Sequence, residues 1–197
     1  MDNGVRMKKR IRLGKKRPIA LGKGPAFERK CCKQLSLWIS SGQRDDVFWR
    51  SAMSGGRATI GLRKNIKRRS QAGDMSAISV EGNLFLKVFV AEFKHRKDLQ
   101  LHNFLAKHSG NTIRFWEKHL GECEAFKRCP FMVAKQNVIP ALLFTNDEGI
   151  MNLEAMCWNI EKVPGLLLAK VRGIWVIDFE TFLTTKLKRR KRVRLNA

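Results

Sequence analysis

The sequence predicts an α/β protein with one hydrophobic core. Its 197 residues are 44% apolar, which is enough to bury one substantial core. The segment after Pro25 has apolar residues at helical spacing, whereas the segment that ends at Glu92-Phe93-Lys94 is a nearly continuous apolar run, as in a buried strand. The change from one period to the other along the chain indicates helices and strands in one fold.

The first elements are a basic arm, a helix and a strand. Residues 1–24 are basic and Gly-rich with little periodicity, and we expect a flexible arm there. Pro25 suits the first turn of a helix, and Gly42 can end it. Its predicted buried positions are Phe27, Cys31, Leu35 and Trp38. A strand around Val47 follows.

Two further strands are expected on either side of a tight turn. The second strand is predicted from Met75 to Val80, the turn at residues 81–83, and the third strand from Leu84 to Lys94. Because residues two apart in a strand share a face, Glu92 and Lys94 point the same way.

The second half of the chain has clear helices and strands only as far as Thr145. A helix from Asp98 to about Lys107 and another from residue 111 to 128 precede strands at 131–136 and 140–145. Beyond them we expect a turn at 146–150, a hairpin about Gly173, a short helix and a basic tail. The predicted organisation is an arm (1–24), a core (25–145), a C-terminal extension for dimerisation or DNA contact (146–185), and a tail (186–197).

The charge points to a polyanionic partner. Forty Lys and Arg residues against 17 Asp and Glu give a formal net charge of +23. Lys and Arg that meet phosphates release condensed counterions, so nucleic acid is the natural partner. A membrane surface is a weaker alternative because no basic amphipathic helix stands out. The solvated basic surface of a ribosomal or packaging protein remains a third interpretation.

The sequence also predicts where the protein works. It has no run of 18 apolar residues that would span a membrane, and its basic N-terminus lacks the apolar region of a secretory signal. Its five cysteines form no C-x-x-C pair and are odd in number, which favours reduced thiols. We expect no membrane partner and a cytoplasmic location.

Three acidic positions and one lysine form the chemical pattern of the chain. Glu28 lies on the first helix, Gly73-Asp74 at the start of a strand, and Glu92 and Lys94 at the end of the next. Carboxylate oxygens are hard ligands that suit Mg²⁺, and Mg²⁺ neutralises phosphate charge and activates water. The simpler alternative is that Glu92 and Lys94 form an ordinary surface ion pair.

This pattern resembles the PD-(D/E)xK nuclease superfamily, with Gly73-Asp74 in place of Pro-Asp. The order of elements is most similar to archaeal Holliday-junction resolvases and their phage-encoded relatives: Glu28, the Ser/Gly stretch SAMSGG (51–56), Asp74, then Glu92 with Lys94. FMVAKQNVIPALLF (131–144) resembles the strands that follow in phage members. The resemblance covers residues 24–145 and implies a restriction-endonuclease-like core, a central mixed β-sheet flanked by helices.

The resemblance implies a Mg²⁺-dependent DNA endonuclease, with Mn²⁺ as a substitute ion. Its catalytic residues would be Glu28, Asp74, Glu92 and Lys94, and the first three would bind the metal together with the backbone carbonyl of Phe93. Lys94 would orient the attacking water or stabilise charge on the phosphate. The predicted DNA-binding residues are Ser51, Ser54, Arg57, Arg63, Lys64, Lys67, Arg68, Arg69 and Lys135.

Several other residues are given structural roles. Gln136 beside Lys135 is a weaker candidate for the site, and His95 and His102 flank the site without a catalytic role. A zinc site from His119, Cys123 and Cys129 fits the usual ligand spacings poorly. The five tryptophans are expected in the core.

The expected partners are DNA, specifically four-way junctions, and a second copy of the chain. Two symmetric nicks across a junction require two paired active sites, which favours a homodimer. The alternatives are a restriction, homing or recombination endonuclease on duplex DNA, and a basic DNA-binding protein without catalysis.

Overall fold

The protein is described here by a computed structural model, which places residues 23–51, 72–157 and 163–187. The helices are α1 (Lys23–Ile39), α3 (Val80–Val88), α4 (Leu101–Lys107), α5 (Asn111–Phe126), α6 (Asp147–Met156) and α7 (Phe179–Phe182). The strands are β1 (Phe48–Arg50), β2 (Met75–Ala77), β3 (Phe89–His95), β4 (Cys129–Lys135), β5 (Leu142–Thr145), β6 (Leu167–Val171) and β7 (Ile174–Asp178).

The main sheet is mixed, as predicted. Its order is β3-β4-β5-β7-β6, in which β3 and β4 are parallel and the other neighbours antiparallel. The parallel pair needs a crossover, and α4 and α5 supply it. β1 and β2 form a separate antiparallel pair. β3 is therefore an edge strand of the main sheet.

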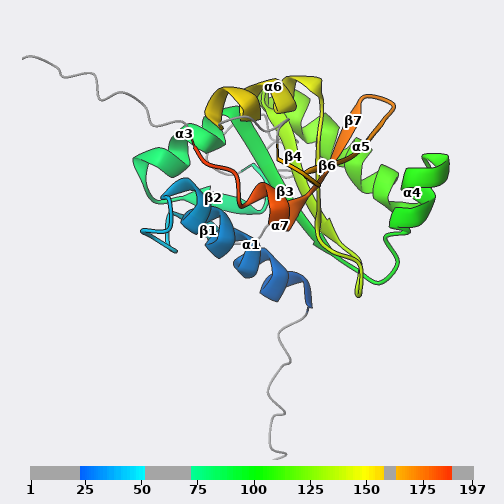
Figure 1. The fold of residues 1–197 in the computed structure, drawn as a ribbon, viewed down its shortest axis with the longest axis horizontal. Helices are drawn as coiled ribbons and strands as arrows, with labels where there is room; N and C mark the ends of the chain where they lie inside the picture. Colours follow the sequence, from blue (N-terminus) through cyan, green and yellow to red (C-terminus); the bar gives the residue numbers. More distant parts are fainter. Residues whose placement is uncertain (1–22, 52–71, 158–162, 188–197) are drawn as a thin grey trace, which may run out of the picture.

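Helices cover both faces of this sheet (Figure 1). Alternate residues of each strand enter different cores: Phe131 and Val133 join the cluster of α1, α3, α6 and α7, whereas Met132 and Ala134 join the cluster of α4 and α5. This period-two alternation, buried on both sides, gives a three-layer arrangement. The fold is the α/β restriction-endonuclease-like core that the sequence predicts.

The predicted tight turn at residues 81–83 is wrong, and so is the first half of the strand predicted after it. Residues 80–88 form α3, whose N-cap Ser79 accepts a hydrogen bond from the N–H of Gly82. Gly82 is needed for close packing, because a Cβ there would lie 2.8 Å from Ala77 and 2.9 Å from Val47. Only the end of the predicted strand, from Phe89, is β3.

The turn predicted at residues 146–150 is also wrong. Asn146 caps α6 by accepting a hydrogen bond from the N–H of Gly149 at 2.8 Å, and the helix continues to Met156. The hairpin about Gly173 is confirmed as β6 and β7, and β7 pairs with β5. Residues after Thr145 thus contribute two strands to the main sheet. Their part in dimerisation or DNA contact stays a prediction.

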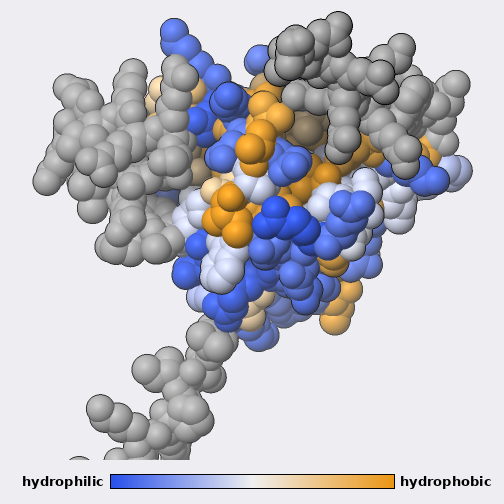
Figure 2. Space-filling view, turned by 90° about the vertical axis from the view of Figure 1, so that its left-hand side faces the viewer, coloured by the Kyte–Doolittle hydropathy of each residue, from blue (hydrophilic) through white to orange (hydrophobic). Residues whose placement is uncertain are grey.

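The face that carries α3, β1 and β2 is hydrophilic in large part, with apolar residues among the hydrophilic ones (Figure 2). Trp38 and Trp116 are buried as expected, but Trp49 on β1 is 60% exposed, so its place in the core was predicted wrongly. Ile78 and Val80, which follow β2, are exposed as well. None of the described helices has the length and apolar content needed to span a membrane.

Candidate active site

Asp74 is fixed between two elements at the open edge of β3. Its backbone N–H donates to the carbonyl of Ala91 at 2.7 Å, and its own carbonyl accepts from the N–H of Ser51 at 2.8 Å. Its carboxylate oxygen Oδ2 accepts from the N–H of Phe93 at 2.8 Å. Asp74 is 2% exposed, so these contacts hold a buried carboxylate beside the end of β3.

Gly73 makes this approach geometrically feasible. Its φ is +77°, and a Cβ at this position would lie 2.2 Å from the carbonyl oxygen of Ala91. Glycine tolerates both conditions because it lacks a Cβ. The dipeptide Gly73-Asp74 therefore brings the chain against β3 where a larger residue would push it away.

We expect Gly73→Ala to lower the free energy of unfolding by about 3 kcal/mol or more, from backbone strain together with the clash. Gly42→Ala is the matched control, because Gly42 has φ +84° with nothing within 4 Å of the added Cβ. Gly42→Ala should lower the free energy of unfolding only by the contribution from backbone strain, about 1 kcal/mol. Urea denaturation of both variants measures the difference, and equal losses would contradict the close approach to β3.

Glu92 and Lys94 form an ion pair on the face of β3 that α5 covers. Their side chains are 12% and 26% exposed, so this is no ordinary surface pair. Burial by itself would lower the pKa of Lys94, but the carboxylates of Glu92, Asp74 and Glu28 outweigh burial and raise it. Lys94 is therefore a cation that is paired with Glu92 and stabilised by the charges of Asp74 and Glu28.

Glu28 reaches the same region from α1. It pairs with Arg50 at the end of β1, and its side chain is 12% exposed. The neighbouring Cys32 shows the shared environment: burial raises the pKa of its thiol to about 12, and Asp74 and Glu28 contribute to that rise. The thiol is therefore uncharged near neutral pH and unsuited to nucleophilic attack.

The predicted DNA-binding residues are only partly described. Ser51 is buried beside Asp74, and its hydroxyl oxygen has no hydrogen-bond partner within the described ranges. Lys135 lies at the end of β4, opposite His95 in the register and partly buried. The other predicted residues, which lie outside the described residues, are Ser54, Arg57, Arg63, Lys64, Lys67, Arg68 and Arg69.

α5 places two further residues beside Glu92: His119, which the sequence offered only in a poor zinc set, and Glu122, which sequence reasoning missed. Glu92, His119 and Glu122 each offer a ligand atom, and these atoms lie within 4.8 Å of one another. In the described part of the chain this is the one group of three that could hold a metal ion, and neither Asp74 nor Glu28 belongs to it. The spacing of three residues between His119 and Glu122, which puts both on one helix face, was the available signal.

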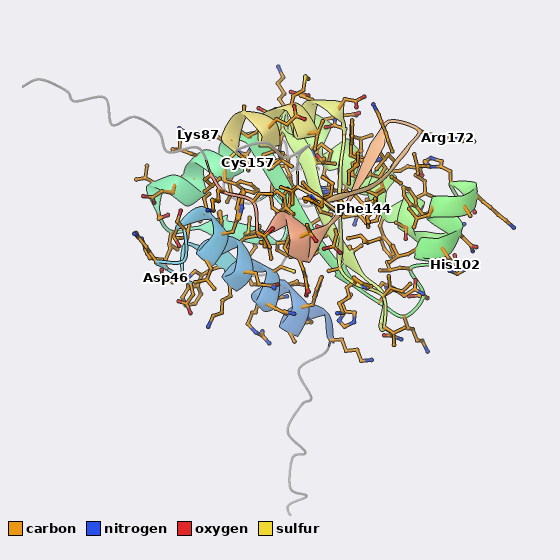
Figure 3. The ribbon with its side chains drawn as sticks, in the orientation of Figure 1. Asp46, Lys87, His102, Phe144, Cys157 and Arg172 are labelled. Atoms are coloured by element: carbon orange, nitrogen blue, oxygen red, sulfur yellow. The ribbon has the colours of Figure 1, made fainter. Side chains whose placement is uncertain are left out.

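Sequence reasoning also missed Arg50, which pairs with Glu28. Among the weaker candidates from the sequence, Gln136 and His95 make structural contacts. Gln136 accepts a hydrogen bond from the N–H of Leu101 at 3.1 Å and so supports the start of α4. His102 lies on α4, on the far side of the molecule from β1 and β2 (Figure 3). His95 packs against Phe27 of α1, with ring centroids 5.4 Å apart.

The zinc set from His119, Cys123 and Cys129 is not assembled. Although Cys123 lies 3.6 Å from Nε2 of His119, the three residues do not form a metal-ligand group among the residues described. The sulfur of Cys129 accepts a hydrogen bond from Asn152 at 3.4 Å. All five cysteines are buried free thiols.

Carboxylates from α1, from the residue before β2 and from β3, with a lysine beside them, form an arrangement suited to phosphate chemistry. Comparison with known proteins agrees: the family described as "Phage putative PDDEXK endonuclease" matches residues 21–195. No curated protein and no solved structure matches the chain. The match spans nearly the whole chain, including the strands after Thr145. The chain therefore belongs to the phage PD-(D/E)xK endonuclease family.

Proposed function

We propose that this protein is a metal-dependent DNA endonuclease whose active site is formed by Asp74, Glu92, Lys94 and Glu28. The proposal is carried by the contacts at the edge of β3, where Asp74 forms hydrogen bonds directly with the strand. The carboxylates of Glu92, Asp74 and Glu28 all raise the pKa of Lys94. A nuclease would bind DNA, and the net charge of +23 favours that partner.

The residues at this edge fit a divalent ion, with Mg²⁺ as the first candidate and Mn²⁺ as a substitute. Asp74 and Glu92 offer carboxylate oxygens. The N–H and C=O of one strand residue point to the same side, so the Phe93 carbonyl faces the edge where Asp74 accepts the Phe93 N–H. When bound, such an ion would neutralise phosphate charge and lower the pKa of water.

The protein's own groups have separable roles in this proposal. Lys94 stays protonated because its pKa is raised, so it acts as a cation towards charge that develops on the phosphate. Glu92 orients Lys94 through the ion pair, and Arg50 orients Glu28 in the same way. The hydroxyl of Ser51, which has no hydrogen-bond partner among the described residues, could donate to a phosphate oxygen.

We propose that the substrate is branched DNA. We further propose that a homodimer of this chain cuts it inside a bacterial or phage-infected cell. The support is the order of motifs, which resembles junction resolvases, and the symmetry argument that paired nicks require two sites. Residues 146–185 are candidates for the dimer interface or for DNA contact.

The test compares a labelled four-way junction with a linear duplex of identical sequence, with Mg²⁺ or Mn²⁺ present. We expect paired nicks at the junction and at least about tenfold slower cutting of the duplex, a difference of about 1.4 kcal/mol in transition-state binding. Light scattering should give a dimer. Equal cutting of both substrates would keep the nuclease and remove the junction preference, in favour of a restriction, homing or recombination endonuclease.

A further inference from the structure

His119 and Glu122 lie against Glu92 although the acidic motif of the site requires neither. His119 is 2% exposed and Glu92 is 9% exposed, so two of the three groups are buried. α5 packs on β3 and β4, which fixes the helix face that carries His119 and Glu122 against the strand face that carries Glu92. The simplest alternative is a histidine satisfied in the core with a glutamate beside it.

Electrostatics argues against that alternative. Glu122 is partly buried, and one of its carboxylate oxygens lies within 4.8 Å of one of Glu92. Glu92 and Glu122 are thus neighbouring carboxylates in a poorly hydrated place, and Glu92 is already paired with Lys94 through one oxygen. A carboxylate has a second oxygen that can act as a ligand. Lys94 compensates the carboxylate of Glu92, and the second carboxylate, that of Glu122, adds negative charge that a bound cation would offset.

The imidazole of His119 has the features of a metal ligand. One of its ring nitrogens lies within 4.8 Å of a carboxylate oxygen of Glu92 and of one of Glu122, and His119 is 2% exposed. A hydrogen bond to the backbone of Val90 holds the ring, and Val90 lies on β3 two residues before Glu92. Ligand histidines are commonly oriented through their second nitrogen by such a backbone contact.

We infer that Glu92, His119 and Glu122 form a divalent-cation site on the α5 side of Glu92, and that its nitrogen ligand makes this site prefer Mn²⁺ to Mg²⁺. The inference rests on the proposed nuclease function, because Glu92 is shared with the Asp74 site. Mg²⁺ prefers oxygen ligands and sheds its water reluctantly, whereas imidazole is a good ligand for transition metals. Glu92 would then link the motif residues to α5.

The inference is tested with Mn²⁺ itself, bound to the full-length, metal-stripped chain. Electron spin echo envelope modulation of the bound Mn²⁺ should show coupling to nitrogen in the wild type and none in His119→Gln. Because His119 is buried and its variant can misfold, Glu122→Gln provides a second measurement. By titration calorimetry it should weaken Mn²⁺ binding at the site by at least about tenfold.

Glu117→Gln is the matched control, because Glu117 is exposed on the same helix and loses the same charge. It should bind Mn²⁺ as the wild type does. An absence of nitrogen coupling in the wild type, or unchanged Mn²⁺ affinity in Glu122→Gln, would overturn the site. Cleavage of DNA by the wild type with Mg²⁺ separates the two proposals. Cleavage without nitrogen coupling would support the nuclease function and exclude the site on α5. No cleavage with any divalent ion would exclude the nuclease function.

Discussion

Asp74→Asn should reduce DNA cleavage by about 10³-fold or more while the protein stays folded and still binds DNA. The substitution removes the negative charge that we assign to metal binding and to the electrostatics of the phosphate. The side-chain oxygen of asparagine can still accept the hydrogen bond from the N–H of Phe93, and the backbone bonds to Ala91 and Ser51 do not involve the side chain. Removing one of three neighbouring carboxylates relieves repulsion, so stability should be unchanged within about 1 kcal/mol or increase.

The measurement is single-turnover cleavage under saturating protein, with thermal unfolding and DNA binding followed in parallel. Asp45→Asn is the control, since Asp45 pairs with Lys33 on the surface and loses the same charge. That variant should cut at the wild-type rate. If Asp74→Asn kept more than about a tenth of the wild-type rate, the assignment of Asp74 to the active site would fail, because loss of an active-site electrostatic group normally exceeds that factor.

Lys94→Met should lower the cleavage rate by about 10²- to 10³-fold with little change in DNA affinity. Methionine retains an unbranched apolar side chain, which can stay against the ring of Phe115 where the Lys94 ammonium lies 5.9 Å from the centroid. What disappears is the cation among Glu92, Asp74 and Glu28. The loss should therefore fall on turnover, because the interaction is made with charge that develops in the transition state.

The control for this change is Lys87→Met, which removes a lysine charge from the exposed face of α3 (Figure 3). Both variants lower the net charge equally, so any general electrostatic loss of DNA affinity is shared. The two variants should differ in their cleavage rates. A rate for Lys94→Met within about threefold of Lys87→Met, less than about 0.7 kcal/mol in activation free energy, would leave Lys94 and Glu92 as a structural ion pair.

Local periodicity predicted the parts of the site that lie on one strand. Alternation placed Glu92 and Lys94 on the same face of β3, and the structure pairs them there. The sequence also predicted that Asp74 lies near that strand, and this is correct, but the reason for the prediction was wrong. A tight turn was expected to bring it there, whereas α3 intervenes and the conformation of Gly73 allows the chain to approach β3.

The errors arise where tertiary packing decides the role of a residue. Gly82 and Gly149 look like turn residues in the sequence, yet each lies in a helix and leaves room for a neighbouring side chain. His119 and Glu122 could be placed on one helix face, but no local signal says which strand that face meets. The pairing of β7 with β5 is similarly non-local, and for that reason residues after Thr145 looked separate from the core.

The proposed metal-dependent nuclease activity is tested most simply by asking whether purified protein nicks a labelled DNA substrate in the presence of a divalent cation. We predict nicking with Mg²⁺ or Mn²⁺, none with a chelator, and none by Asp74→Asn prepared in the same way. Binding of DNA without nicking under any divalent cation would contradict this prediction, as would equal nicking by the Asp74→Asn preparation.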